Sequence, residues 1–203
     1  MDKTEIIVAT GNRGKLKEIR QICSDLPVFF SSLADHWAEV PDIQETGSTF
    51  LQNARIKARW VFERQGIWTL ADDSGLEVDA LNGEPGVRSA RYAGENATDQ
   101  QNCDLLLNRM EGIPKTGRTA RFRCVMVLIG PGEREYVAEG SCEGVIGFEP
   151  LGDGGFGYDP LFMPAGREES FAQIPSQHKH AISHRGKALS ELSRKIHELF
   201  GKR

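Results

Sequence analysis

Strands and helices alternate along this 203-residue chain, and that alternation predicts an α/β fold. The apolar run at 6–9 is typical of a strand buried on both faces, and a glycine-containing turn and a helix follow it. Two long alternating runs, at 119–129 and 135–146, predict an antiparallel hairpin. This hairpin is either a second lobe or an arm through which two subunits meet.

The other elements follow from local patterns. The remaining expected strands are short apolar or alternating runs, at 28–30, 67–71 and 76–81. The expected helices carry apolar side chains every three or four positions, at 16–26, 49–65, 99–111 and 187–200. Thr98 is a suitable N-cap for the third of these helices.

The composition is that of an ordinary globular protein, long enough for one domain or two small lobes. Hydrophobic residues make up 39% of the chain and charged residues 27%. The net charge is -4, so the surface as a whole does not attract polyanions and we expect no nucleic-acid partner. Any phosphate must be bound by local cations, backbone amides or a metal.

Four cysteines, at 23, 103, 124 and 142, show neither a C-x-x-C pair nor zinc-ligand spacing. We expect buried thiols in a reducing compartment. The N-terminus is charged and continues directly into a strand, and no apolar run is long enough to span a bilayer. The sequence therefore predicts a cytoplasmic protein that is not bound to a membrane.

The most informative stretch, residues 71–76, contains two adjacent carboxylates. Asp72 and Asp73 follow an apolar run, and Ser74-Gly75 predicts the turn that ends this strand. Neighbouring strand residues point to opposite faces, so we expect the two acids to have different roles. Paired acids at a strand end suit a hard cation such as Mg²⁺. The alternative is a solvated turn.

A glycine-containing turn joins the first strand to the first helix. Its residues are Thr10, Gly11, Asn12, Arg13, Gly14 and Lys15. A helix start presents free backbone N–H groups and the positive end of the helix dipole, which suit phosphate, and Lys15 adds a charge. The spacing is not that of a Walker A loop. A tight turn with an exposed lysine is the alternative reading.

A polar loop before the second helix carries Glu45, and Asn53 and Lys57 lie one turn apart on that helix. If the helix start faces the same cleft, Glu45 joins Asp73 at a metal and Lys57 reaches phosphate. The alternatives are an acid that stabilises the helix dipole and a solvated lysine.

Two later loops add groups that suit a nucleotide. In a glycine-rich loop, Phe156 can stack on a base and Asp159 can accept a hydrogen bond. Farther on, Lys179, His184 and Arg185 place cationic donors at a helix start. The alternatives are a loop packed by its own aromatic side chains and a solvated basic surface. Together, the loops predict a Mg²⁺-dependent nucleotide enzyme or a nucleotide binder.

This combination resembles the inosine/xanthosine triphosphate pyrophosphatase family, whose members remove non-standard purine nucleotides. The matching pieces occur in the same order and cover nearly the whole chain: Thr10-Gly11-Asn12 with Lys15, Glu45-Thr46-Gly47 with Asn53-Ala54 and Lys57-Ala58, residues 71–76, Ser89-Ala90-Arg91-Tyr92, residues 154–160, and Ile182-Ser183-His184-Arg185-Gly186.

The resemblance implies an α/β fold with a central long mixed β-sheet, flanking helices and two lobes around a nucleotide cleft, within a single domain over residues 1–203. It implies a homodimer and Mg²⁺. It also implies hydrolysis of dITP, ITP, XTP and dXTP to the nucleoside monophosphate and pyrophosphate. Such a reaction cleanses the nucleotide pool and keeps these nucleotides out of DNA and RNA.

Carried over residue by residue, the family's metal site falls on Glu45 and Asp73, and Asp73 is also the catalytic proton acceptor. The substrate-binding residues that the resemblance implies are Thr10, Gly11, Asn12, Arg13, Gly14, Lys15, Lys57, Ser74, Phe156, Gly157, Tyr158, Asp159, Lys179, His184 and Arg185. Two places depart from the family's pattern. Gln44 stands where bacterial members often carry a second acid, and Gln177-His178 replaces a commoner acidic pair.

Base choice would follow from donor and acceptor matching. Hypoxanthine and xanthine present a carbonyl oxygen where adenine presents an amino group, and donors such as Arg185 or His184 suit the oxygen. A non-catalytic nucleotide-binding module is a second hypothesis. A pyrophosphatase for other nucleotides, like the septum-inhibitor-like proteins, is a third. The presence of Lys15, Glu45 and Asp73 together favours the enzyme, because binding alone needs no base.

Overall fold

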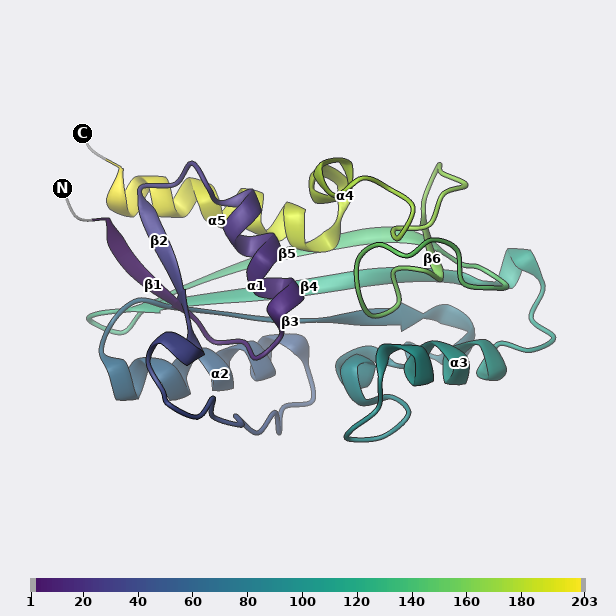
Figure 1. The fold of residues 1–203 in the computed structure, drawn as a ribbon, viewed down its shortest axis with the longest axis horizontal. Coiled ribbons are helices and arrows are strands. Elements are labelled where there is room, and N and C mark those ends of the chain that lie inside the picture. The colour runs from purple at the N-terminus through teal and green to yellow at the C-terminus, as the bar shows by residue number, and fades with distance from the viewer. Residues whose placement is uncertain (1–2, 202–203) are drawn as a thin grey trace. The chain divides into compact units, whose positions relative to one another are not determined.

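The computed structural model describes residues 3–201 (Figure 1). In chain order its strands and helices are β1 (Thr4–Val8), α1 (Arg13–Ile22), β2 (Val28–Ser32), α2 (Phe50–Gln65), β3 (Thr69–Val78), α3 (Asp99–Arg109), β4 (Thr119–Gly130), β5 (Arg134–Ile146), β6 (Phe162–Pro164), α4 (Ser176–Ile182) and α5 (His184–Phe200). The charged N-terminus considered above begins with Met1 and Asp2, which lie outside the described residues.

The strands form one mixed sheet in the order β2-β1-β3-β4-β5-β6. Strand β1 pairs in parallel with β2 and β3, whereas β5 pairs antiparallel with β6. Strands β4 and β5 form the predicted hairpin. A short turn joins them at one end, and at the other the Ile146 N–H donates to the Arg118 carbonyl over 2.9 Å. The predicted α/β fold with a mixed sheet is therefore confirmed.

The chain divides into two compact units, which are described separately. Unit 1 takes the described residues of Met1–Asp73, Cys124–Glu139 and Gly186–Arg203. Unit 2 takes Ser74–Arg123 and Gly140–Arg185. Strands β3, β4 and β5 each contain a boundary between the units.

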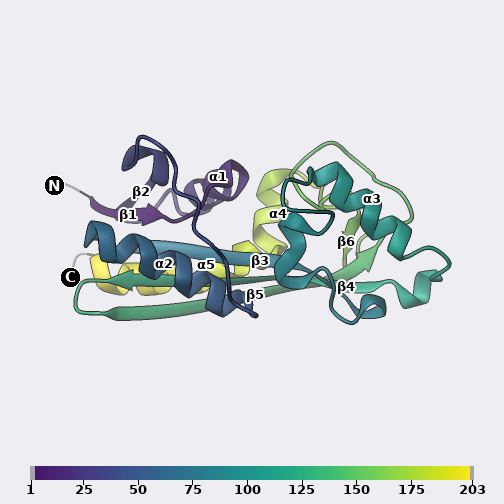
Figure 2. The same cartoon turned by 90° about the horizontal axis from the view of Figure 1, so that it is seen from below.

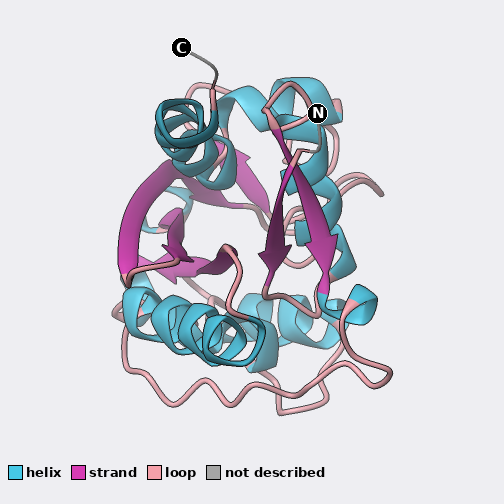
Figure 3. Cartoon of the chain, turned by 90° about the vertical axis from the view of Figure 1, so that its left-hand side faces the viewer, coloured by secondary structure: helices cyan, strands magenta, loops and turns pink. Residues whose placement is uncertain are grey.

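Unit 1 has helices on both faces of its strands (Figures 1 and 3). Helices α1 and α5 cover one face, where Ile19 and Leu192 belong to the same cluster as Leu70. Helix α2 lies along the strands on the other face (Figure 2), where Val61 packs in a cluster with Ala71. Leu70 and Ala71 are neighbours, so β3 buries both of its faces, and this explains its continuous apolar sequence.

Unit 2 is built around an aromatic cluster that also receives apolar side chains of α3. The ring centroids of Phe122 and Phe162 lie 4.7 Å apart, and that of Phe171 lies 5.0 Å from Phe162. Leu106 of α3 and Met110, which directly follows this helix, are completely buried in the same cluster. This core supports the glycine-rich loop, because Tyr158 is one of its members.

The acidic pair lies within a strand, and the turn predicted at Ser74-Gly75 is wrong. Strand β3 continues from Thr69 to Val78 without interruption. The preference of Ser-Gly for turns is local, and here the sheet overrides it, because Leu76 and Val78 are completely buried on the continuing strand.

Several boundaries differ from the predicted ones. Helix α1 ends at Ile22 and does not reach residue 26, and α5 begins at His184, three residues earlier than expected. The pattern did not predict β6 or α4, which have three and seven residues and are too short to establish a period. Among residues 3–201, no helix combines the length and the apolar character that crossing a bilayer requires.

Candidate functional site

The turn between β1 and α1 folds around the start of the helix. The Asn12 side chain caps α1, because its Oδ1 accepts the Lys15 backbone N–H over 3.1 Å. The Thr10 hydroxyl oxygen accepts the Asn12 N–H, also over 3.1 Å. Gly11 and Arg13 are exposed. The turn therefore combines a capped helix start with a surface that a phosphate can approach.

Lys15 points back to the sheet and pairs with the first acid of β3. Strand β1 ends at Val8, which pairs with Leu70, so Asp72 lies just beyond the last paired residue. The Lys15 Nζ lies 3.1 Å from Asp72 Oδ2, and the Asp72 side chain is completely buried. A buried carboxylate needs such a partner, and Asp72 in turn fixes the position of the Lys15 ammonium.

Asp73 has different partners. Its Oδ2 accepts a hydrogen bond from Asn53 Nδ2 over 3.0 Å, and its Oδ1 lies 3.8 Å from Lys57 Nζ. Burial raises the pKa of the Asp73 carboxyl above its usual range, although Lys57 and Lys15 act in the opposite direction. A carboxylate with a raised pKa accepts a proton more readily, which suits a general base.

The Lys57 ammonium lies close to both candidate metal ligands, Glu45 and Asp73. Its ammonium forms an ion pair with Glu45 and lies near Asp73. Burial lowers the pKa of Lys57, but the negative charges of Asp73 and Glu45 outweigh burial and raise it, so the side chain is cationic. Two carboxylates that already share one cation have the oxygen donors that Mg²⁺ prefers.

Protein donors for a metal are nevertheless few. Within residues 3–201, no three or more His, Cys, Asp or Glu side chains are grouped as a metal site. Magnesium commonly binds through one or two carboxylates and completes its shell with water and substrate phosphate. The pair Glu45 and Asp73 fits that mode.

In unit 2, the glycine-rich loop is held by two acids. Asp159 Oδ2 accepts the Phe156 N–H over 2.9 Å and the Lys179 ammonium over 2.6 Å. Asp99 Oδ2 accepts the Gly157 N–H over 2.7 Å. Gly155 has a positive φ of 75°, and a side chain there would collide with the Asp159 carboxylate. Backbone and carboxylate are thus packed too closely for any other residue.

The basic helix start gathers around the same loop. Arg185 Nη2 donates to the Ser74 hydroxyl over 2.9 Å, and the Arg185 guanidinium lies 5.6 Å from the Phe156 ring centroid. Lys179 Nζ lies 5.2 Å from the same centroid. His184 stacks on Phe122 at 4.7 Å between centroids. Unit 2 therefore brings one aromatic ring together with cationic donors.

The side chain of Tyr158 makes a hydrogen bond inside the core of unit 2. Its hydroxyl donates to the Ser89 carbonyl over 2.9 Å, and the residue is buried. The Ser89 hydroxyl oxygen accepts the Leu76 N–H over 2.9 Å and donates to the Gly86 carbonyl over 2.6 Å. Ser89, in the piece Ser89-Ala90-Arg91-Tyr92, thereby ties β3 to the turn that follows it.

Sequence reasoning named Asn53 and Ser89 without giving them a supporting role, and it did not single out Asp99. Asn53 shares a helix face with Lys57, and this spacing was the available signal. Asp99 lies in the first turn of α3, where acidic residues are common, so its sequence position gave no sign that it binds the glycine-rich loop. The predicted residues of the turn at 10–15 lie in unit 1 with Glu45, Lys57 and Asp73. The other predicted site residues, Ser74, Phe156, Gly157, Tyr158, Asp159, Lys179, His184 and Arg185, lie in unit 2.

A family model described as the Ham1 family matches residues 6–195. The chain belongs to the Ham1 family. A Geobacter sulfurreducens relative named dITP/XTP pyrophosphatase is 48% identical over 189 residues, which cover 93% of this chain and 94% of the relative. The family recognised from the motifs is confirmed.

Solved structures agree with this membership. A HAM1 protein from Coxiella burnetii has a TM-score of 0.86 at 43% identity, with 96% of this chain and 99% of that chain covered. The Staphylococcus aureus Ham1 protein has a TM-score of 0.85 at 38% identity, with the same 96% and 99% covered.

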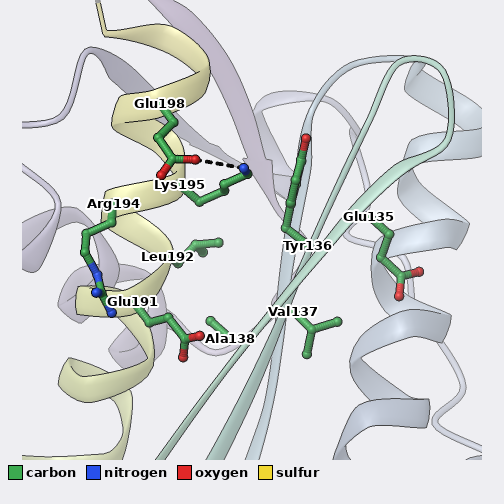
Figure 4. A pocket seen from close by; sticks show the side chains of 9 residues that line it. All are labelled: Glu135, Tyr136, Val137, Ala138, Glu191, Leu192, Arg194, Lys195 and Glu198. Atoms are coloured by element: carbon green, nitrogen blue, oxygen red, sulfur yellow. Dashed lines mark hydrogen bonds and ion pairs between the residues drawn. The ribbon is translucent and has the colours of Figure 1, made fainter.

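This Ham1-family chain also has an open hollow of about 510 Å³ in unit 1, between α5 and β5 (Figure 4). Residues 135–138 of β5 line one side, and α5 supplies acidic and basic side chains, including Lys195, which donates to Glu198 over 2.8 Å. None of the predicted site residues lines it. The hollow is therefore distinct from the predicted site.

Proposed function

We propose that this chain hydrolyses dITP, ITP, XTP and dXTP to the nucleoside monophosphate and pyrophosphate. This reaction removes non-standard purines from the nucleotide pool before they enter DNA or RNA. The relative named dITP/XTP pyrophosphatase, 48% identical to this chain, supports the proposal. The observation that carries it is the environment of Asp73, a buried carboxylate held by Asn53 and close to Lys57.

In this proposal Asp73 is the general base. A water molecule gives a proton to the Asp73 carboxylate while its oxygen bonds to the α-phosphorus. The bond from the α-phosphorus to the bridging oxygen breaks, and pyrophosphate leaves with the electron pair. The raised pKa of Asp73 supports this role, because it brings the acceptor's proton affinity closer to that needed at neutral pH.

Lys15, Lys57 and the start of α1 bind the phosphates. Their positive charges and backbone N–H groups stabilise the charge that builds up on the phosphate oxygens. The ion pair of Lys15 with Asp72 supports this role, because it holds the Lys15 ammonium at the same helix start.

Mg²⁺ is the proposed cofactor, and Glu45 and Asp73 would hold it. When bound, it would withdraw charge from the phosphates. The convergence of both carboxylates on Lys57 supports this assignment, since it makes a site that already binds a cation.

The cluster of unit 2 recognises the base. Phe156 offers a ring for stacking, and Arg185 and His184 offer donors for the carbonyl oxygen of hypoxanthine or xanthine. An adenine amino group would leave these donors unpaired, which is the physical basis of discrimination. Ser74, Gly157, Tyr158, Asp159 and Lys179 complete the proposed nucleotide site.

We propose a homodimer of single-domain chains in the cytoplasm, without nucleic-acid or membrane partners. The net charge of -4 supports the absence of nucleic-acid binding. The cysteines support a reducing compartment, because all four are buried and form no disulfide bond within the described residues.

Product analysis tests the function. The purified protein is incubated with Mg²⁺ and ITP, XTP or ATP, and monophosphate, pyrophosphate and orthophosphate are separated and quantified. We expect equal amounts of IMP and pyrophosphate from ITP, and little product from ATP. Orthophosphate as the main product contradicts the proposal. Tight ITP binding without turnover would identify a nucleotide-binding module.

A further inference from the structure

The amide of Asn53 joins two segments that both carry candidate catalytic groups. Asn53 is completely buried near the start of α2. Its Oδ1 accepts the Gly47 N–H over 2.8 Å, and its Nδ2 donates to Asp73 Oδ2 over 3.0 Å. A backbone N–H cannot accept and a carboxylate cannot donate, so these two partners determine which way the amide faces.

The loop at Gly47 approaches this amide as closely as a glycine permits. A Cβ at Gly47 would lie 2.6 Å from Asn53 Oδ1 and 2.6 Å from the Cβ of Gln52. Real Cβ atoms do not come this close, so a side chain would force the loop away from α2. Glu45 is only two residues earlier in the same loop, so its backbone position depends on this contact.

We propose that Asn53 is a positioning residue that holds the Asp73 carboxylate and the Glu45 loop in one fixed arrangement for hydrolysis. This inference rests on the proposed function and adds a residue that contacts the Asp73 carboxylate and the loop that carries Glu45, without contacting substrate. The hydrogen bond to Oδ2 opposes rotation of the Asp73 carboxylate. It leaves Oδ1 on the side of Lys57, 3.8 Å away. Supporting bonds of this kind keep reacting groups in their productive geometry.

A purely structural role makes a different prediction. If Asn53 only satisfied its own buried polar atoms, its loss would lower stability and leave the rate per folded molecule unchanged. A positioning role affects kcat, because the misaligned base acts in the transition state, and it leaves KM nearly unchanged.

The principal variant is Asn53→Leu, which keeps the number and branching of the side-chain heavy atoms and removes both hydrogen bonds. We expect kcat for ITP to fall about 10- to 100-fold and KM to change less than about 3-fold. We also expect the Gly47 amide to exchange with solvent at least about 10-fold faster, because its acceptor is lost. Circular dichroism melting establishes the folded fraction.

Gln52→Ala is the matched control. Gln52 precedes Asn53 on α2, and its Oε1 accepts bonds from the Ser48 N–H and hydroxyl over 2.8 Å and 3.0 Å. The variant loosens the same loop without touching Asp73, so we expect kcat within about 2-fold of wild type.

Gly47→Ala serves as a second variant, because it disturbs the contact and retains the Asn53 side chain. We expect the same fall in kcat, so the inference remains testable even where Asn53→Leu does not fold. A wild-type kcat in either folded variant overturns the inference, as does an equal loss in Gln52→Ala. A wild-type protein that makes no pyrophosphate from ITP is a separate result, which overturns the proposed function itself.

Discussion

The Lys15 ammonium lies 3.1 Å from the completely buried Asp72 carboxylate. The next residue, Asp73, contacts Asn53 and Lys57 instead. Two adjacent acids therefore have separate partners, since neighbouring side chains of a strand point to opposite faces. Asp72 fixes the position of Lys15, the proposed phosphate-binding residue, and Asp73 is the proposed general base.

The effects on stability of removing the Lys15 ammonium and of removing the Asp72 charge should not be additive. Lys15→Met takes the ammonium away from a buried carboxylate, and we expect a loss of about 3 kcal/mol in the free energy of unfolding. The double variant Lys15→Met/Asp72→Asn should be more stable than the sum of the single effects by at least about 1 kcal/mol. Urea denaturation measures both. Lys17→Met, at an exposed position of α1, is the control, and additive single effects would contradict the coupling.

Asp73→Asn should abolish turnover while the protein remains folded. The carboxamide cannot take the proton of the attacking water, so we expect kcat for ITP to fall at least about 100-fold. Asp104→Asn, which changes an exposed acid of α3, should retain the wild-type rate. Steady-state kinetics with pyrophosphate detection decide the matter, and a wild-type rate in Asp73→Asn would remove Asp73 from the mechanism.

The same variant should change how stability depends on pH. The pKa of Asp73 is raised above 3.8 in the folded protein, so the native state holds this proton more tightly than the unfolded chain does. The resulting stabilisation is complete below pH 3.8 and is lost as the pH rises through the folded pKa. As the pH rises through the folded pKa of Asp73, we expect the melting temperature of Asp73→Asn to increase relative to that of wild type, measured in metal-free buffer. A relative decrease would contradict a raised pKa of Asp73.

Glu45 should contribute to metal affinity independently of turnover. With Mn²⁺ as a paramagnetic probe, we expect Glu45→Gln to raise the dissociation constant at least about 10-fold. Glu39→Gln, at an exposed position in the preceding segment, should leave it unchanged. Removing metal with EDTA should stop turnover, and added Mg²⁺ should restore it. Equal Mn²⁺ affinity in wild type and Glu45→Gln would exclude Glu45 as a ligand.

Phe156→Ala should weaken nucleotide binding. Stacking of a base on an aromatic ring contributes about 1–3 kcal/mol, so we expect KM for ITP to rise about 10-fold. Phe148→Ala is a suitable control, because the residue is 64% exposed and its ring packs against the Arg118 guanidinium. An unchanged KM in Phe156→Ala would mean that the ring only supports the loop.

Local pattern predicted the elements whose signals are long or strongly apolar. Strand β1 was predicted at 6–9 from its apolar run and spans Thr4–Val8. Helix α2 and the hairpin of β4 and β5 were predicted to within one residue of their ends, because hydrophobic periodicity is clear over such lengths. Strand β3 was not. Its Ser74-Gly75 pair prefers a turn locally, whereas burial of Leu76 and Val78 requires the strand to continue.

The sequence by itself determined the family, because its motifs occur in order over nearly the whole chain, and it named the acids and cations of the proposed site. Only the tertiary structure decided their partners: Lys15 with Asp72, Asn53 with Gly47 and Asp73, and Asp99 with Gly157. The physical reason is that charge and donor type are properties of a residue. The distance between two residues far apart in the chain depends on how strands and helices pack.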